Sequence, residues 1–296
     1  MNRLILGGAF IIIAVLGAFG LFDWSGRKSI GNTIINSRGS DIDQLVEFPI
    51  SGIDSLDISS VSADLVFTRT ESRTVTAQLT GTSSVEPELV GEREGSAGTI
   101  RVIWPKSIST NARNMQLAIS LPRDFQGELH LNTVSGEIET PREALFEELS
   151  ANSVSGAVEI SGGESSELDL STVSGKISVS DYTTGNLLLS TTSGDMIYTG
   201  RAGELNIRSV SGDAEIELDE LNGDVTLKNT SGDIMLKFSE PISARVYFRT
   251  VSGDMRSDFP IVTTSAKPTS IEGTIGDGAY RIDGNTVSGD IRILRY

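Results

Sequence analysis

The sequence contains no cysteine, one histidine, 8 prolines and only 6% aromatic residues among its 296 residues. The lack of cysteine excludes disulfide bonds, thiolate chemistry, zinc–cysteine sites and a lipidated N-terminal cysteine. A Ser-His-Asp triad would have to use the lone histidine, His130, and no G-x-S-x-G sequence accompanies it. Because His130 stands between Leu129 and Leu131, we predict that it points to solvent from a strand.

Positive charge is also scarce. The chain has 24 Lys and Arg residues against 40 Asp and Glu residues, a formal net charge of −16. An acidic surface repels phosphate backbones, so we expect no nucleic-acid partner, and it disfavours electrostatic docking to anionic lipid. The simplest role of the acidic side chains is to keep a long sheet surface soluble.

An uncharged apolar run occupies residues 4–22. About 20 residues rising ~1.5 Å each span ~30 Å, enough to cross a bilayer as a helix. We predict that residues 1–22 form a transmembrane anchor; the alternative is a signal peptide cleaved at the small-residue site 18–20. Residues 23–50 form a polar spacer. We expect the N-terminus inside and the body outside the cytoplasmic membrane, because long domains cross largely regardless of flanking charge.

Glycine is frequent, with 31 residues, and the motif Val-Ser-Gly-Asp recurs with close variants. Successive copies are 18 to 21 residues apart, except for a last interval of 36 residues. We interpret that interval as two periods in which one corner has degenerated, near Gly273 to Gly278. A diverged copy far upstream has Ala63 in the glycine position. The glycines predicted to form structural corners are Gly136, Gly156, Gly175, Gly194, Gly212, Gly232, Gly253 and Gly289.

Each copy follows a run in which apolar and polar residues alternate, as in LHLNT at 129–133. Period two indicates a strand with one face inward. The small polar residue and glycine that follow suit a corner with positive φ. Further glycines before several copies predict two or three short strands per repeat; these are Gly127, Gly185, Gly203 and Gly223.

These features predict an all-β fold, a single-domain parallel β-solenoid over residues 51–296 with rungs of roughly 19–20 residues. Such units are too short for a βαβ crossover, and stacking pairs each strand with its copy about 4.8 Å away. Residues 68–125 are less regular, and we predict larger rungs there and part of an N-terminal cap over the open strand edges. An antiparallel sandwich or propeller is the competing fold.

Three sequence features together resemble the bacterial putative-adhesin domain of unknown function. They are SSVSADLVF at 59–67, MQLAISLP at 115–122 and the recurring L-x-L-x-T-V-S-G-D-I. The resemblance covers about residues 51–296 and implies a β-strand-repeat protein of the cell envelope, often behind an N-terminal membrane segment. It supplies no catalytic residues. Ala157 and Lys176 replace the usual acidic corner residue, so the acid is not required at every rung.

Glu139 and Glu159 occupy equivalent outward positions on adjacent rungs, about 4.8 Å apart at the backbone. Two carboxyls at such a spacing could serve a retaining glycosidase, so a polysaccharide-acting β-helix enzyme is an alternative function. The column continues without forming a dedicated cleft, and we predict no enzyme and no catalytic residue. Its further members are Ser178, Ile197, Glu215, Met235, Arg256 and Arg292.

Acidic residues stand next to most corner glycines. Stacked carboxylates could bind Ca²⁺, but the G-G-x-G-x-D nonapeptide of calcium-binding β-helices is missing. We therefore predict exposed turn residues, no metal site and no cofactor. The corner acids are Glu137, Asp195, Asp213, Asp233, Asp254 and Asp290.

The residue before each corner serine is mostly valine. Strict strand alternation would turn these residues outward as an apolar stripe for a partner or for self-association. We expect instead that the corner rotates them inward. The column comprises Val134, Val154, Val173, Thr192, Val210, Thr230, Val251 and Val287.

The sequence thus predicts a non-enzymatic cell-envelope module for binding or structure, adhesin-like and displayed outside the cytoplasmic membrane. Its partner would be an envelope protein or a glycan, and residues 4–22 would contact the membrane. A membrane-tethered scaffold or sensor that contacts another envelope protein is the further alternative.

Overall fold

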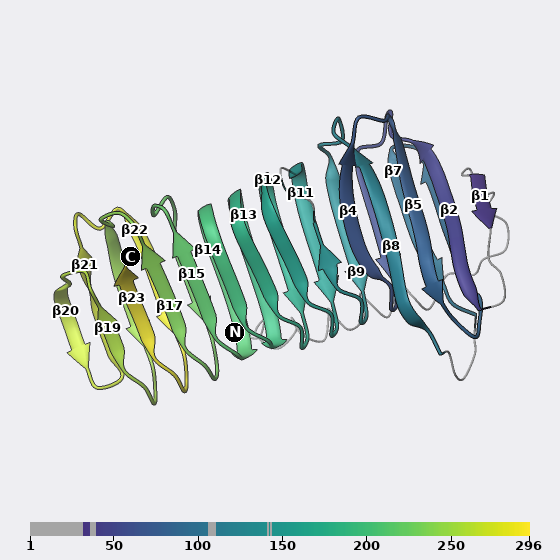
Figure 1. The fold of residues 1–296 in the computed structure, drawn as a ribbon. Helices are drawn as coiled ribbons and strands as arrows, with labels where there is room; N and C mark the ends of the chain where they lie inside the picture. Colours follow the sequence, from purple (N-terminus) through teal and green to yellow (C-terminus); the bar gives the residue numbers. More distant parts are fainter. Residues whose placement is uncertain (1–31, 36–39, 106–110, 141, 143) are drawn as a thin grey trace. The chain divides into compact units, whose positions relative to one another are not determined.

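The computed structural model describes residues 32–35, 40–105, 111–140, 142 and 144–296 (Figure 1). Every regular element in these ranges is a β-strand, which confirms the predicted all-β class. Contacts divide the chain into two compact units, residues 1–160 and 161–296. The single domain over residues 51–296 therefore stays a prediction.

The predicted anchor or signal peptide, residues 1–22, lies outside the described residues, as does the predicted spacer up to residue 31. Residues 41–49 of that spacer form a strand with one buried face, so a polar spacer reaching residue 50 is wrong. Within the ranges given above, no helix has the length and apolar character needed to cross a membrane. The membrane segment and the position of the body outside the cytoplasmic membrane stay predictions.

Among its described residues, the first unit contains eleven strands and the start of a twelfth, which continues into the second unit. These are β1 (Asn32–Ile35), β2 (Asp41–Pro49), β3 (Ser55–Ser60), β4 (Asp64–Thr70), β5 (Thr74–Thr82), β6 (Glu88–Glu94), β7 (Ala97–Ile103), β8 (Arg113–Pro122), β9 (Glu128–Thr133), β10 (Ile138–Glu139), β11 (Ala144–Ser153) and β12 (Val158–Thr172).

Parallel pairing builds the body of the first unit. Strands β7, β3, β9 and β11 lie side by side in that order, and so do β8, β4, β10 and β12. One strand from each series, joined by a corner, makes a rung. Like residues stack on like, since Leu56 pairs with Leu129 and Leu129 with Leu149, all of them buried. The earliest rung of the chain, β3–β4, thus lies between the later rungs β7–β8 and β9–β10.

Antiparallel strands pair with the rung β7–β8 at one end of the first unit. Strand β5 pairs with β8, β2 with β5, β1 with β2, and β6 with β7. The side chain of Gln44, on β2, is buried and donates from Nε2 to the carbonyl of Pro87 at 2.8 Å. Its Oε1 accepts the N–H of Leu89, also at 2.8 Å. The irregular stretch 68–125 thus supplies larger, hairpin-bearing elements, as its sequence predicts.

The second unit holds the remaining strands. They are β13 (Ile177–Ser193), β14 (Met196–Ser211), β15 (Ala214–Leu218), β16 (Val225–Lys228), β17 (Ile234–Phe238), β18 (Ala244–Arg249), β19 (Met255–Ser257), β20 (Val262–Lys267), β21 (Ser270–Ile275), β22 (Tyr280–Asn285) and β23 (Ile291–Arg295).

Parallel rungs also build the second unit. Strands β13 and β14 pair over three short segments, with a register shift between Val179 and Tyr182. Beyond them, β15, β17, β23 and β19 follow in one series, and β16, β22 and β18 in the other. Ile216 pairs with Leu236, one period further along the chain. The structure thus contains stacked parallel rungs of two or three short strands, the β-solenoid arrangement expected from the repeat.

The last rung of the chain is inserted into the stack. Strands β22–β23 lie between β16–β17 and β18–β19, and Figure 1 shows β23, in yellow, between β17 and β19. Strands β20 and β21 form an antiparallel hairpin against β18. The expected degenerate corner near Gly273 to Gly278 is therefore wrong: the 36-residue interval contains this hairpin, and Gly273 lies in β21. The inserted rung satisfies strand edges on both of its sides.

Alternating burial fills each interior with apolar side chains. On β9, Leu129 and Leu131 are fully buried, and each such leucine stabilises the fold by about 1.5–3 kcal/mol relative to an exposed one. The largest fully buried side chains of the second unit are Tyr182, Tyr198 and Phe238.

Candidate functional site

The corner glycines form a column in each unit. A Cβ on Gly156 would overlap the carbonyl oxygen of Gly136, and a Cβ on Gly136 would overlap that of Ala63. Ala63 itself faces the rung β7–β8, whose strands are joined by a longer segment without a Ser-Gly step. Close approach between rungs therefore requires glycine here. In the second unit the stacking order is Gly175, Gly194, Gly212, Gly232, Gly289 and Gly253.

The corner has two conformations. At Gly136 the N–H donates to Oγ1 of Thr133 at 3.0 Å, and φ is not positive. At Gly232 φ is +124°, and the N–H instead donates to the carbonyl of Ser288 on the neighbouring rung at 2.9 Å. The positive φ expected at the corners is thus confined to the later ones, Gly212, Gly232, Gly253 and Gly289.

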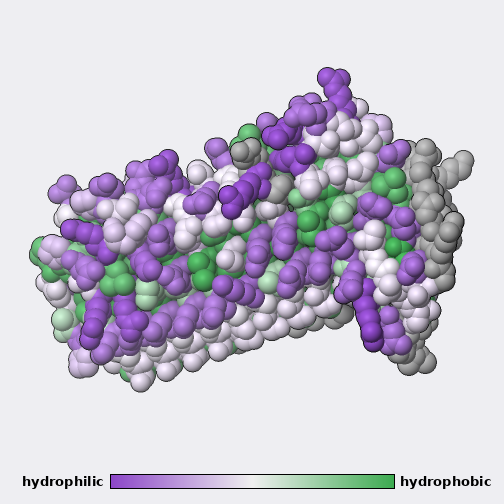
Figure 2. Space-filling view, in the orientation of Figure 1, coloured by the Kyte–Doolittle hydropathy of each residue, from purple (hydrophilic) through white to green (hydrophobic). Residues whose placement is uncertain are grey.

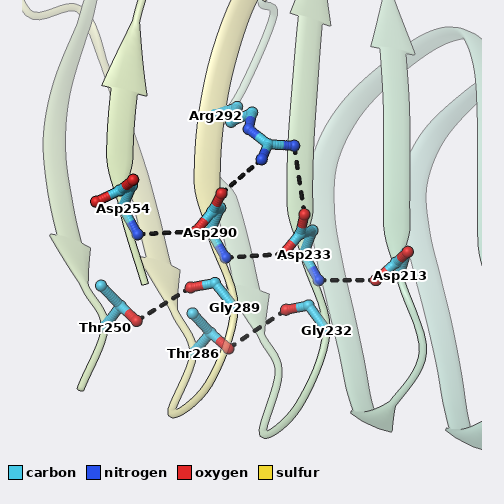
Figure 3. Close-up of polar contacts among 9 residues, drawn as sticks. All are labelled: Asp213, Gly232, Asp233, Thr250, Asp254, Thr286, Gly289, Asp290 and Arg292. Carbon is cyan, nitrogen blue, oxygen red and sulfur yellow. Dashed lines mark hydrogen bonds and ion pairs between the residues drawn. The ribbon is translucent and has the colours of Figure 1, made fainter. Parts of the chain in front are cut away.

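The corner aspartates of the second unit form a ladder of hydrogen bonds. Oδ1 of Asp195 accepts the backbone N–H of Asp213 at 3.0 Å. The ladder continues through Asp233, Asp290 and Asp254, at 2.8 Å for each step (Figure 3). In the first unit, Oδ1 of Asp64 accepts the N–H of Glu137 at 2.9 Å.

Arg292 adds charge to this ladder, since its guanidinium pairs with both Asp233 and Asp290 (Figure 3). The hydrogen bond from the N–H of Asp254, together with Arg292, outweighs desolvation and holds the pKa of the Asp290 carboxyl below its ordinary value. The carboxylates of Asp195, Asp213, Asp233 and Asp290 therefore bind backbone N–H groups of neighbouring rungs. Among the described residues, no group of three or more acidic or histidine side chains is placed to hold a metal ion.

A column of buried polar residues lies three positions before the corner glycines, and the sequence analysis assigned it no role. Oγ1 of Thr250 donates to the carbonyl of Gly289 at 3.1 Å (Figure 3). The hydroxyls of Ser153, Thr191 and Ser209 have no hydrogen-bond partner in the described part of the chain. A side-chain hydroxyl or amide recurs at this position of each repeat, and that recurrence could have identified the column from the sequence. The column contains Ser60, Thr133, Ser153, Thr172, Thr191, Ser209, Asn229, Thr250 and Thr286.

His130 lies on the outer face of β9, as its alternation predicts. Its imidazole is partly exposed between two carboxylates, with Nε2 3.6 Å from Glu128 and Nδ1 3.9 Å from Glu148. The two glutamates flanking it are solvent-accessible, so the arrangement is a small surface charge cluster.

Glu139 and Glu159 are direct partners on β10 and β12, and both are exposed. In the second unit the corresponding column runs Ser178, Ile197, Glu215, Met235, Arg292, Arg256. Arg292 precedes Arg256 because of the inserted rung. The column thus changes between acidic, polar, apolar and basic side chains along the stack, although two pairs of adjacent rungs share a residue type.

The valine column corrects one expectation. Val210, Val251 and Val287 are 53%, 67% and 51% exposed, so their predicted inward rotation is wrong. The buried polar residue before each valine, such as Thr250, points inward, and alternation then turns the valine outward. In the first unit, Val134 and Val154 are half-buried. Figure 2 shows hydrophobic residues in small patches on a mostly hydrophilic face of the second unit.

One pocket of the second unit combines charged and aromatic side chains. Its volume is about 340 Å³, within the ordinary range for small-ligand sites. Three successive rungs line it with residues 181–183, 199–201, 217 and 219, and Tyr296 completes it. Nε of Arg201 lies 3.0 Å from Oδ2 of Asp219.

Stacked parallel rungs with glycine corners define the class of protein as a β-solenoid. Residues 53–294 match the model of the Toastrack DUF4097 family. The chain therefore belongs to this family, which confirms the resemblance found in its sequence.

Comparison with curated proteins gave no match. Among solved structures, a "putative adhesin" from Parabacteroides distasonis is 12% identical, with a TM-score of 0.49, and the match covers 87% of this chain and 98% of that one. A "putative adhesin" from Parabacteroides merdae is 16% identical, with a TM-score of 0.48 and coverage of 87% and 97%. A "putative lipid binding protein" from P. distasonis is 18% identical, with a TM-score of 0.46 and coverage of 88% and 98%. These names describe those proteins and not this chain.

Proposed function

We propose that the chain is a non-enzymatic binding or structural module of the bacterial cell envelope, adhesin-like and displayed outside the cytoplasmic membrane. One observation carries the proposal: the repeated Ser-Gly-Asp corner residues bond to neighbouring rungs, as Asp233 does to Asp290. The repeat therefore serves the scaffold, while the outward strand residues vary along the stack. A rigid scaffold with a variable outer surface suits recognition of an extended partner.

The apolar run at residues 4–22 supports a position at the membrane, and the lack of cysteine suits an oxidising compartment. Because the chain has no cysteine, one introduced thiol can report its location. The variants Ser252→Cys, at an exposed corner, and Asn2→Cys, before the apolar run, form a matched pair.

A membrane-impermeant maleimide is added to intact spheroplasts of a bacterial host expressing each full-length variant. We expect labelling at position 252 without lysis and labelling at position 2 only after lysis or not at all. Labelling at position 252 that requires lysis would place the body in the cytoplasm and contradict the proposal.

Binding is tested by co-sedimentation of the full chain with purified cell-wall material and by cross-linking in whole cells. We expect one stable envelope partner, a glycan or a protein. A chain that is exposed outside but recovers neither class of partner would contradict the binding role.

The pocket near Tyr296 favours a second candidate, the polysaccharide-acting enzyme, because Asp181, Glu217 and Asp219 all line it. Incubation of the full chain with neutral tetrasaccharides distinguishes the two candidates. The proposed module leaves the tetrasaccharides intact, whereas release of shorter sugars that is lost in Glu217→Gln would establish the enzyme.

A further inference from the structure

The pocket near Tyr296 is built by the widest rungs of the second unit. The register of β13 against β14 shifts between Val179 and Tyr182, and Asp181 has a φ of +53°. A positive φ is uncommon outside glycine, although aspartate adopts it more readily than most residues. The N–H of Asp181 donates to Oγ1 of Thr199 at 3.2 Å. This turn brings Asp181 to the wall of the pocket.

A buried tyrosine, Tyr198, holds two of the backbone segments that line the pocket. The hydroxyl of Tyr198 lies 2.9 Å from the carbonyl oxygen of Tyr182 and 2.7 Å from that of Arg201, and shares its proton between them. Burial raises the pKa of the Tyr198 phenol, so it remains a donor. Both carbonyls belong to segments that line the pocket, which is therefore preformed on a rigid support.

The walls carry planar polar groups beside one aromatic ring. Arg201 and Asp219 are 60% and 52% exposed at their side chains while 3.0 Å apart, so each keeps hydrogen-bonding capacity toward a ligand. The side chain of Tyr296 is half exposed at the rim. Partial burial and the charge of Glu217 raise the pKa of the Tyr296 phenol, which remains a neutral hydroxyl.

We infer that this pocket binds one unit of an uncharged saccharide, with the Tyr296 ring against the sugar face and Asp219 and Arg201 on its hydroxyls. The inference rests on the proposed binding function and names its ligand class. Carboxylates accept hydrogen bonds from sugar hydroxyls, a guanidinium donates to sugar oxygens, and an aromatic ring covers the apolar C–H face.

The charge of the pocket selects against acidic sugars. Asp181, Glu217 and Asp219 line the pocket with one cation, Arg201, which pairs with Asp219. Lys237, outside the lining, lies 3.8 Å from Glu217 but also pairs with Glu215, so the group keeps a net negative charge. A carboxylated or phosphorylated sugar would meet this net negative charge at short range. The ligand is therefore a neutral sugar within a glycan.

The test uses the full chain in a zwitterionic detergent without a sugar headgroup. Cellotetraose and tetra-N-acetylchitotetraose are the neutral probes, tetragalacturonate is the acidic probe, and binding is measured by isothermal titration and ligand-observed NMR. We expect at least one neutral tetramer to bind about tenfold or more tightly than the acidic one. Tyr296→Ala and Asp219→Asn should each weaken that binding about tenfold or more, while Tyr280→Ala, outside the pocket, leaves it unchanged.

The inference is overturned if neither neutral tetramer binds, or if tetragalacturonate binds more tightly than both. It is also overturned if Tyr280→Ala and Tyr296→Ala lose the same binding affinity. Circular dichroism of each variant confirms that the fold is retained. If the pocket binds no sugar while the chain is exposed outside the membrane and keeps an envelope partner, only this inference falls and the proposed function stands.

Discussion

The carboxylate of Asp233 accepts the backbone N–H of Asp290 at 2.8 Å, although 57 residues separate them in the chain. The bond joins the inserted last rung, β22–β23, to the rung β16–β17. Asp290 in turn accepts the N–H of Asp254 at 2.8 Å. In the second unit, the carboxylates of Asp195, Asp213, Asp233 and Asp290 thus each link one corner to the next in the stack, whatever the order of the rungs in the chain.

We predict that Asp290→Asn removes part of the acid sensitivity of the fold. The pKa of the Asp290 carboxyl is lowered in the folded chain, so its stabilising effect is complete above the ordinary carboxyl pKa and is lost as the pH falls through the lowered one. The melting temperature of the wild type should therefore drop more steeply than that of the variant between about pH 5 and pH 2. Thermal unfolding followed by circular dichroism at several pH values measures this difference.

The matched control is Asp277→Asn, at an exposed turn aspartate outside the ladder. Its melting temperature should follow the wild-type pH dependence. Parallel curves for Asp290→Asn and the wild type would show that the ladder contributes nothing to the acid response.

The sequence predicts the rungs well because period two and the corner glycine leave few alternatives for each repeat. It does not predict their order, since near-identical corners stack equally well on one another. The backbone N–H and the carboxylate of Asp290 can form the same hydrogen bonds with any rung that carries a corner aspartate. The hairpin β20–β21 and the antiparallel pair β5–β8 decide the order, and neither has a counterpart in the repeat.

The pocket was missed for a related reason. Asp181 and Thr199 are one rung apart in the sequence, as are Arg201 and Asp219, yet these positions lie outside the Val-Ser-Gly-Asp motif. A search at the rung period away from the motif could have paired them. Tyr296 joins them only through the inserted rung, which no periodic pattern predicts.

We predict that Gly156→Ala lowers the free energy of unfolding by about 1–3 kcal/mol or more, because its Cβ would overlap the carbonyl of Gly136. Backbone atoms cannot rotate away as a side chain can, so the two rungs must separate. Ser155→Ala, in the same corner and exposed, removes one hydrogen bond of 3.1 Å to Val134 and should cost about 0.5–1.5 kcal/mol at most. Urea unfolding compares the two, and an equal small effect would show that the rungs do not approach as closely as described.

We predict that Gln44→Leu destabilises the first unit by roughly 2–5 kcal/mol. Its amide satisfies the carbonyl of Pro87 and the N–H of Leu89, and each buried group left unpaired costs about 1–3 kcal/mol. Amide exchange at Leu89 should also become faster. Gln78→Leu, at an exposed position of β5, is the control; it removes one exposed hydrogen bond to Asp43 and should cost about 1 kcal/mol or less. Slow exchange at Leu89 in Gln44→Leu would mean that other contacts hold this end of the unit.

The orientation of the valine column is tested by two substitutions on the same strand and corner. Val246 on β18 is fully buried, whereas Val251 is 67% exposed. Val246→Ser removes apolar contacts and buries a hydroxyl, so we expect a loss of about 2 kcal/mol or more. Val251→Ser should change the free energy of unfolding by about 0.5 kcal/mol or less, because the side chain is already solvated. Equal losses for the two variants would mean that the corner turns Val251 inward after all, and that the outward stripe of Val210, Val287 and Val251 does not exist.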